Sequence, residues 1–231
     1  MTTHVVTGAG SGIGRVVAER LRDRGDRLVL LARSAERAAE LRPDFPDAVV
    51  LEGDLARPGS LRGLGEAITG GVDSLLHVAG VVWLGPIVDQ DLDAWQHQLD
   101  VNLTAPAVLT RELLPHLRLA RGTVVFVNST AGLTASPEWG AYAASKFGLR
   151  ALADSLRAEE ASHGVRVTTV FPGRTATPMQ ELVHEQEGRA YDPSGFLLPE
   201  TVAEAILQVV DLPRDATAAE VVLRPGPRPT P

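Results

Sequence analysis

The amino-acid sequence predicts an α/β protein: one domain built on a doubly wound parallel sheet of seven strands, with helices on both faces. Two observations lead to this class. Short apolar runs with strand character alternate with longer stretches of helical spacing, which is the pattern of consecutive β-α-β units. A glycine-rich turn also joins the first apolar run to the first helical stretch. The 231 residues suit one core, which we place at residues 1–223, followed by a tail at 224–231.

Each predicted element follows from a local pattern. Helical apolar spacing occupies residues 15–21, 94–119, 139–162 and 200–210. Pro106 should bend the second of these helices, because its ring removes a backbone donor and clashes one turn back. Residues 174–199 are rich in glycine, proline and charge, and long loops of this kind are often lids, so we expect an irregular substrate lid there. The seven candidate strands are residues 4–7, 27–32, 48–51, 74–79, 123–127, 165–170 and 220–223.

The turn from Thr7 to Gly14, with the sequence TGAGSGIG, is interpreted as an anion cradle. Such a turn points backbone N–H groups from a helix N-terminus at a pyrophosphate, and glycines let the chain approach it closely. The dinucleotide fingerprint G-x-G-x-x-G fits from neither Gly8 nor Gly10, and the glycines that fit a related spacing are Gly8, Gly12 and Gly14. A glycine-rich surface turn without a ligand is the alternative.

The end of the second strand bears on the type of cofactor. Dinucleotide folds that bind NAD place an acidic residue there, against the ribose 2′-OH, whereas this chain has Ala32 followed by Arg33 and Ser34. A guanidinium can form a forked contact with a 2′-phosphate. We therefore expect NADP(H) rather than NAD(H). The alternative is that Arg33 and Ser34 only begin a solvated helix.

Three residues form a candidate catalytic set. Tyr142 and Lys146 stand four apart in the predicted helix 139–162, so their side chains share one face. Tyrosine titrates near pKa ~10, and a nearby ammonium should lower the pKa of Tyr142 and make it a general acid or base for a carbonyl or alcohol oxygen. Ser129 ends the strand before this helix and can hold the same oxygen. Taken alone, a Tyr-x-x-x-Lys pair is more often a solvated helix edge.

With these motifs in place, the chain resembles the classical short-chain dehydrogenase/reductase family over nearly its whole length. The resemblance implies a Rossmann-type fold with strand order 3-2-1-4-5-6-7 and a homodimer or homotetramer. It adds Asn102 as a fourth catalytic residue, which helps to hold a water between the lysine and bulk solvent. It also implies that Asp54 contacts adenine, that Lys146 binds the nicotinamide ribose, and that a threonine after Pro172 reaches the carboxamide. The expected cofactor contacts are Gly8, Ser11, Gly12, Ile13, Gly14, Arg33, Ser34, Asp54, Leu55, Ala79, Gly80, Tyr142, Lys146, Pro172, Gly173, Thr175 and Thr177.

Two segments depart from the family pattern. His77 opens the sequence His-Val-Ala-Gly where the family usually has Asn-Asn-Ala-Gly, and we expect its ring to be satisfied by backbone rather than to act in catalysis. Residues 220–227 lack the glycine-rich ending that is common in the acyl-carrier reductases of the family, which argues against an acyl-carrier substrate. Candidate pocket walls are Trp83, Trp139, Met179, Leu182 and Val183.

Composition excludes several other classes. The chain has 22 basic and 29 acidic residues, a net charge of −7 and scattered basic side chains, which argues against nucleic-acid binding. There is no cysteine for a disulfide or a thiolate, and the six histidines show no metal-ligand spacing. No apolar run approaches the roughly 20 residues of a membrane helix, and no signal peptide is recognisable, so the expected location is cytoplasmic, away from the membrane.

The sequence therefore predicts an NADP(H)-dependent oxidoreductase that transfers a hydride between nicotinamide and a small carbonyl or secondary alcohol, with Tyr142 as general acid/base. The open alternative is a regulatory sensor that binds NADP(H) without significant turnover, which would need the glycine turn and Arg33 but not a tuned phenol. Sugar epimerases of related fold need a larger substrate domain, and enoyl reductases generally place the lysine farther from the tyrosine.

Overall fold

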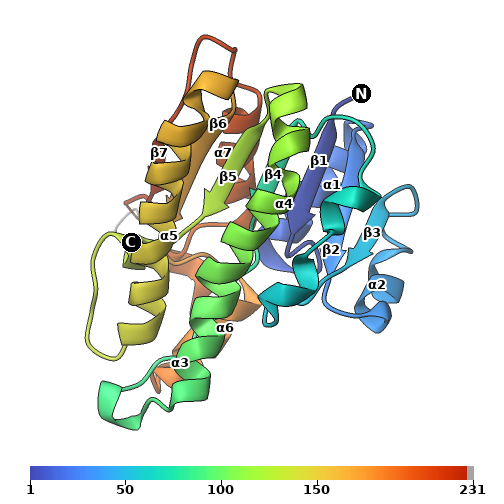
Figure 1. Ribbon diagram of the computed structural model, residues 1–231. Helices are drawn as coiled ribbons and strands as arrows, with labels where there is room; N and C mark the ends of the chain where they lie inside the picture. Colours follow the sequence, from blue (N-terminus) through green and yellow to red (C-terminus); the bar gives the residue numbers. More distant parts are fainter. Residues whose placement is uncertain (228–231) are drawn as a thin grey trace.

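A seven-stranded parallel sheet forms the centre of the protein, in a computed structural model that describes residues 1–227 (Figure 1). The strand order is β3-β2-β1-β4-β5-β6-β7, which confirms the predicted fold class and topology. Residues 228–231, the end of the expected tail, lie outside the described residues. The strands are β1 (Thr3–Thr7), β2 (Arg27–Ala32), β3 (Val49–Glu52), β4 (Ser74–His77), β5 (Thr123–Val127), β6 (Arg166–Pro172) and β7 (Glu220–Leu223).

Helices cover both faces of the sheet. Successive strand side chains point to opposite faces, so Val5 and Val124 belong to one apolar core and Val6 and Val125 to the other. The first core packs under α4 (Ala105–Ala120) and α5 (Gly140–Glu160), and the second under α1 (Gly12–Asp23) and α7 (Pro199–Val210) (Figure 1). Because both faces are covered, β1, β4, β5 and β6 are buried along their whole length.

Local caps start the shorter helices. The Ser34 hydroxyl accepts the Arg37 N–H at the start of α2 (Ala35–Leu41), and the Asp91 carboxylate accepts the Ala94 N–H at the start of α3 (Leu92–Leu99). In α6 (Pro178–Gln186), Thr177 is the cap and proline takes the first helical position, where its missing N–H costs little. Helices α3 and α6 lie toward the carboxyl ends of the strands, at the lower end of Figure 1.

Two predictions about helices are wrong in detail. Residues 94–119 do not form one bent helix: a π-helical segment, Asp100–Thr104, separates α3 from α4. Pro106 lies in the first turn of α4, so it follows the change of helix type instead of bending a continuous α-helix. The stretch 174–199 is not wholly irregular either, since it contains α6 and a 3₁₀ turn at Pro193–Gly195.

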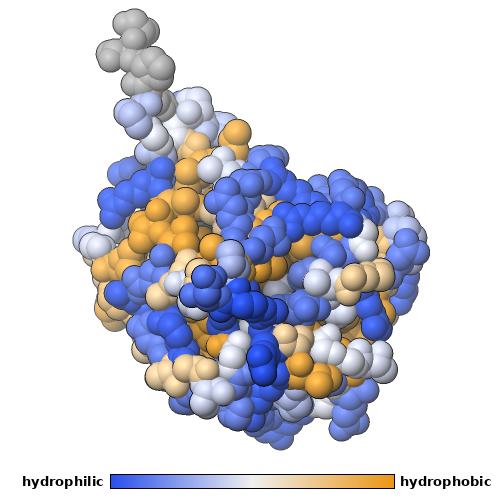
Figure 2. All heavy atoms as spheres, turned by 90° about the horizontal axis from the view of Figure 1, so that it is seen from above, coloured by the Kyte–Doolittle hydropathy of each residue, from blue (hydrophilic) through white to orange (hydrophobic). Residues whose placement is uncertain are grey.

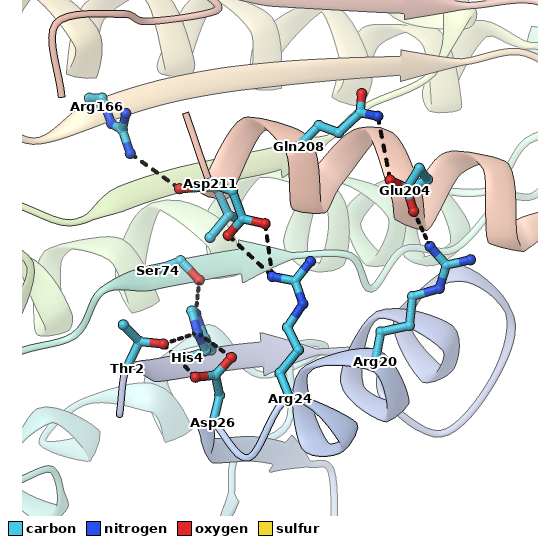
Figure 3. A network of polar contacts seen from close by, with 11 residues as sticks. Thr2, His4, Arg20, Arg24, Asp26, Ser74, Arg166, Glu204, Gln208 and Asp211 are labelled. Atoms are coloured by element: carbon cyan, nitrogen blue, oxygen red, sulfur yellow. Dashed lines mark hydrogen bonds and ion pairs between the residues drawn. The ribbon is translucent and has the colours of Figure 1, made fainter. Parts of the chain in front are cut away.

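A polar network lies at the amino ends of the central strands (Figure 3). Nδ1 of buried His4 is 2.7 Å from the Ser74 hydroxyl oxygen, and its Nε2 is 2.9 Å from that of Thr2 and 3.5 Å from the Asp26 carboxylate. Burial lowers the pKa of His4, although the Asp26 carboxylate acts in the opposite direction. Ion pairs Arg20–Glu204 and Arg24–Asp211 join α1 to α7 nearby.

The surface is mixed in character. Seen from above Figure 1, apolar residues gather mainly toward the left of the view, with smaller apolar groups among the hydrophilic residues elsewhere (Figure 2). Within residues 1–227, no helix combines the length and the apolar character needed to cross a bilayer. The same residues contain no cluster of three or more histidine, cysteine, aspartate or glutamate side chains that could hold a metal ion.

Candidate active site

The turn between β1 and α1 has the shape of a cradle because of its glycines. Gly8 and Gly12 have φ values of +79° and +53°, a region that favours glycine. A Cβ on Gly14 would lie 2.3 Å from the carbonyl oxygen of Gly8, so any side chain there would force the turn open. Thr7 braces the turn from inside, because its hydroxyl oxygen accepts the N–H groups of Val78 at 3.0 Å and Ala79 at 3.2 Å. The turn therefore exposes backbone at the first residues of α1.

The three predicted catalytic side chains meet where β5 and α5 come together. The Ser129 hydroxyl lies close enough to that of Tyr142 to lower the pKa of the phenol. Nζ of Lys146 donates to the Val127 carbonyl oxygen at 3.2 Å and lies 5.7 Å from the centre of the Tyr142 ring. Tyr142 and Lys146 are both buried. Lys146 is the only lysine in the chain.

Burial shifts the pKa values of both candidate catalytic groups on α5, and one prediction is wrong here. Desolvation raises the pKa of Tyr142 to about 12, with a smaller lowering from its hydrogen bond to Ser129. Desolvation also lowers the pKa of Lys146 to about 8. The expected lowering of the tyrosine pKa by the ammonium is absent, because burial penalises each charged form. Tyr142 is therefore a protonated phenol at neutral pH.

Asn102 lies in the π-helical segment and does not line the cavity. Its amide accepts the Val81 N–H and donates to the Val81 carbonyl, both at 2.9 Å, and donates to the Ser145 hydroxyl at 3.0 Å. Ser145 in turn donates to the carbonyl of Tyr142 at 2.7 Å. The side chain thus ties the segment after β4 to the catalytic turn of α5. Pro106, four residues on, has no N–H for the backbone carbonyl of Asn102.

A cavity of about 1110 Å³ runs from the glycine turn to the catalytic residues. Ser129 lines it, as do Pro172 and Gly173 after β6. One wall between these ends is formed by Gly80, where an added Cβ would lie 3.6 Å from Nζ of Lys146. The structure thus brings the two halves of the predicted site into one cavity. The predicted cofactor contacts that line it are Gly8, Ser11, Gly12, Ile13, Gly14, Ala79, Gly80, Tyr142, Lys146, Pro172, Gly173, Thr175 and Thr177.

Four predicted cofactor contacts lie outside this cavity. Arg33 is exposed, and its side chain makes no hydrogen bond or ion pair with any residue in the described range 1–227. Ser34 caps α2, and Asp54 pairs with Arg57 at 2.9 Å. Leu55 packs against the core under α4. The role expected of these four residues, on the adenine side of a cofactor, stays a prediction.

The lid residues divide into those that face the cavity and those that do not. Met179 and Val183 of α6 line it, as does Trp139, whose ring meets that of Tyr142 edge-on at 5.7 Å. Leu182 is exposed and Trp83 packs edge-on against His97, and neither lines the cavity. The apolar cluster around the phenol consists of Val82, Ala131, Tyr142 and Val183, with Leu84, Trp139 and Met179 packed against it.

Polar contacts fasten the segment 174–199, predicted to be a lid, to the rest of the protein. Arg174 makes two hydrogen bonds to the Glu187 carboxylate, at 3.0 and 2.6 Å. The Gln186 side chain accepts the Leu84 N–H at 2.6 Å, which joins the end of α6 to the segment after β4. A backbone bridge pairs Thr175 with Leu197. These contacts hold α6 in place over the cavity.

His77 is satisfied by a side chain rather than by backbone as predicted. Its Nε2 lies 2.9 Å from the Thr110 hydroxyl oxygen of α4, and its ring stacks on Phe126 at 4.9 Å and 4°. Burial lowers the pKa of His77 to about 3. The ring is neutral and lies outside the cavity, so it braces the sheet against α4.

Sequence reasoning missed three residues that organise this site. Asn128, Ser145 and Thr7 are buried polar side chains that bond to the catalytic or glycine segments. Thr7 and Ser145 stand inside the recognised motifs, so their position was a usable signal. Asn128 lies next to Ser129, between an apolar strand and a turn. Polar residues are common at such a position, so nothing in the sequence signals its hydrogen bond to the distant Lys146.

Comparison with known proteins gives a consistent family match. A family described as short chain dehydrogenase matches residues 2–188. Dehydrogenase/reductase SDR family member 7B of Bos taurus is 35% identical over 216 residues, which cover 87% of this chain and 65% of that protein. Glycine betaine reductase ATRR of Emericella nidulans is 34% identical over 245 residues, which cover 97% of this chain and 19% of that protein. The chain thus spans less than two thirds of the length of these two relatives.

Solved structures share the fold. A metagenomic short-chain oxidoreductase in complex with NADP has a TM-score of 0.81 and 28% identity, with 98% of each chain covered. An alcohol dehydrogenase from the archaeon Thermococcus sibiricus, complexed with 5-hydroxy-NADP, has a TM-score of 0.86 at 24% identity, with 100% of this chain and 99% of that chain covered.

Proposed function

This chain belongs to the short-chain dehydrogenase family, and from that membership we propose that it is an NADP(H)-dependent oxidoreductase acting on a small carbonyl or secondary alcohol. The observation that carries the proposal is the meeting of Ser129, Tyr142 and Lys146 in a cavity that continues to a glycine cradle. A proton donor, a second oxygen ligand and a dinucleotide groove are the parts that carbonyl reduction requires.

The residues present fit a dinucleotide. The turn at Gly8, Gly12 and Gly14 leaves a concave surface that a Cβ on Gly14 would destroy, and the N-terminus of α1 supplies N–H groups for a pyrophosphate. Thr175 and Thr177 also line the cavity and would hold the carboxamide end. When bound, the nicotinamide supplies or takes up the hydride.

Proton transfer is the task of the phenol. With its pKa raised to about 12, Tyr142 holds its proton at neutral pH and can donate it to a carbonyl oxygen during reduction. The Ser129 hydroxyl oxygen accepts the Ala131 N–H at 3.1 Å, which leaves its own hydrogen for the phenolic or the substrate oxygen. Lys146 stabilises the phenolate that remains and would bind the ribose hydroxyls. In oxidation the roles reverse.

A preference for NADP(H) is supported by two guanidinium groups near the adenine side. Arg33 is exposed and free of side-chain partners within residues 1–227. Nη2 of Arg37 lies 3.4 Å from the position of a Cβ on Gly10, beside the glycine turn. Charge-assisted bonds from a guanidinium favour a phosphate over a hydroxyl.

The wall beside the phenol suggests substrates with an apolar substituent. Val82, Trp139, Met179 and Val183 surround the Tyr142 ring on the substrate side of the cavity. In a site of this composition, binding is favoured by the removal of apolar surface from water. A polyol would find few hydrogen-bonding partners there. Ketones or aldehydes that carry an alkyl or aryl group are therefore the substrates to test first.

The decisive experiment is a panel of carbonyl and alcohol compounds, followed by NADPH absorbance, with binding of NADPH and NADH measured in parallel. We expect turnover of at least one apolar ketone or aldehyde. The competing function, an NADP(H) sensor, would give tight NADPH binding with no turnover on the whole panel. Absence of both binding and turnover would overturn the oxidoreductase proposal.

We also propose that the protein forms a homodimer or homotetramer through α4 and α5. Both helices carry exposed apolar side chains, Leu119 and Phe147 among them, and burying such residues against a second copy would remove them from water. Sedimentation at micromolar concentration tests this: a species of at least two chains is expected, and monomer alone would contradict it.

A further inference from the structure

Asn128 stands between two residues that touch the catalytic turn of α5. The backbone carbonyl of Val127 accepts a hydrogen bond from the Lys146 ammonium at 3.2 Å, and the Ser129 hydroxyl lies close enough to that of Tyr142 to lower the pKa of the phenol. The side chain of Asn128 is 4% exposed and points to the same turn. Three consecutive residues at the end of β5 thus hold one turn of α5.

The amide of Asn128 makes two contacts of opposite polarity. Its Oδ1 accepts the Ser129 N–H at 2.8 Å, and its Nδ2 donates to the backbone carbonyl of Lys146 at 2.9 Å. A carbonyl oxygen has two lone pairs, so Lys146 can accept this bond in addition to its helical one. Only a side chain with an acceptor and a donor of this reach makes both bonds.

The surroundings of the amide are anchored and tightly packed. The backbone N–H of Asn128 donates to the carbonyl of Val170 on β6 at 2.7 Å, which fixes it to the sheet. A Cβ on Gly132 would lie 2.4 Å from Oδ1 of Asn128 and 3.0 Å from the carbonyl oxygen of Lys146. The absence of a side chain at Gly132 therefore lets the turn after β5 close over the amide.

We infer that Asn128 is a positioning residue, which fixes the catalytic turn of α5 to the end of β5 so that Ser129 and Lys146 keep one mutual geometry. The inference rests on the proposed function for its catalytic consequence, but the positioning itself does not need turnover to be observed. Asn128 acts through its neighbours, because both hydrogen bonds of its side chain go to backbone groups of Ser129 and Lys146.

The single lysine makes the test direct. Protein grown with lysine labelled at the ε carbon by a stable isotope gives one lysine resonance, which reports the titration of Lys146 alone. The other ionisable side chains around the cavity are Glu138, Tyr142, Arg174, Glu187, Arg189 and Arg224. None of them makes a hydrogen bond to Nζ within residues 1–227, so the environment that sets this titration is burial against β5.

The test compares Asn128→Ala with Gln98→Ala, which removes another buried amide that makes two bonds to backbone, at Trp83. In Asn128→Ala the released turn should expose Lys146 to water, so the pKa of Lys146 should rise by at least about 0.5. On an active substrate, kcat should fall roughly 10- to 100-fold, because small displacements of reacting groups are costly. Gln98→Ala should leave both readouts within error, even if both variants melt earlier.

Asn128→Ser provides a second variant if the alanine protein does not fold, since its hydroxyl can accept the Ser129 N–H but is too short to reach Lys146. A folded Asn128→Ala or Asn128→Ser protein with the wild-type titration of Lys146 would overturn the inference, whatever its activity. A wild-type protein without turnover would count against the proposed function instead, and the lysine titration would still decide the role of Asn128.

Discussion

Nζ of Lys146 lies 5.7 Å from the centre of the Tyr142 ring, one helical turn along α5, and both groups are buried. Each charged form is therefore disfavoured, which raises the pKa of the phenol and lowers that of the amine. The Tyr142 phenol is therefore a neutral proton donor, and it lies beside a Lys146 ammonium that burial has made easier to deprotonate. This arrangement suits protonation of a carbonyl oxygen.

Removal of the phenolic hydroxyl tests the proton-transfer role. In Tyr142→Phe the ring still packs against Trp139, so NADPH affinity should stay within a few-fold of wild type, while kcat should fall roughly 10²- to 10⁴-fold. Tyr191→Phe is the matched control, because the only other tyrosine packs on His184 outside the cavity. Unchanged kcat in Tyr142→Phe would remove the phenol from the mechanism.

Replacement of the buried ammonium should stabilise the protein while it abolishes activity. Lysine with a folded pKa of about 8 and an ordinary value near 10.5 destabilises the fold at pH 7, and this cost disappears as pH rises from 8 to 10.5. Lys146→Met should therefore raise the free energy of unfolding by about 1–2 kcal/mol at pH 7. Denaturant titrations of both proteins at pH 7 and pH 10 measure this difference in unfolding free energy. If the stabilisation by Lys146→Met is as large at pH 10 as at pH 7, the buried charge is not its cause.

Charge reversal after β2 tests cofactor choice. Arg33→Asp places a carboxylate where a 2′-phosphate would lie, so kcat/KM for NADPH should fall at least about 10-fold while that for NADH stays equal or rises. Arg42→Asp, at the other end of α2, is the control and should change neither value by more than about 2-fold. A variant that keeps its NADPH preference would assign Arg33 to the solvated start of the helix.

Acid should destabilise the protein partly through His77. Its folded pKa of about 3 lies below the ordinary 6.5, so between these values the unfolded chain binds a proton that the folded chain refuses. Stability then falls as pH drops below 6.5, by up to about 1.4 kcal/mol per pH unit for this residue. His77→Gln, which cannot titrate but can bond to Thr110, should flatten the dependence of Tm on pH between 6.5 and 4.5. Exposed His163→Gln should keep the wild-type slope, and equal slopes in all three proteins would refute the assignment.

The sheet was predictable because parallel strands covered on both faces appear as apolar runs, and the turn at Gly8–Gly14 marks the first crossover. The break between α3 and α4 could not be predicted, because the apolar spacing of residues 94–119 continues through the π-helical segment. Helix α6 was hidden by glycine, proline and charge, although Thr177 and Pro178 form a normal helix start. The spacing of apolar residues predicts an element well when one periodicity runs along its whole length. It predicts the element poorly when an α-helix changes to a π-helix without a change in that spacing.

The candidate site also has features that the sequence predicted and features that it could not predict. Spacing along one helix predicted that Tyr142 and Lys146 share a face, and the order of segments predicted that Ser129 joins them. The direction of the tyrosine pKa shift could not be predicted, because it depends on how deeply tertiary packing buries the phenol. The bond from Asn128 to Lys146 likewise joins residues eighteen positions apart, on elements whose mutual placement only the folded sheet decides.

The single lysine has a practical consequence for how this protein is handled. Lys146 is buried at 3% exposure, so coupling reagents directed at lysine side chains would find no exposed target within residues 1–227. For the same reason, amine cross-linkers are a poor choice for counting subunits, and carboxyl-directed reagents should be used instead.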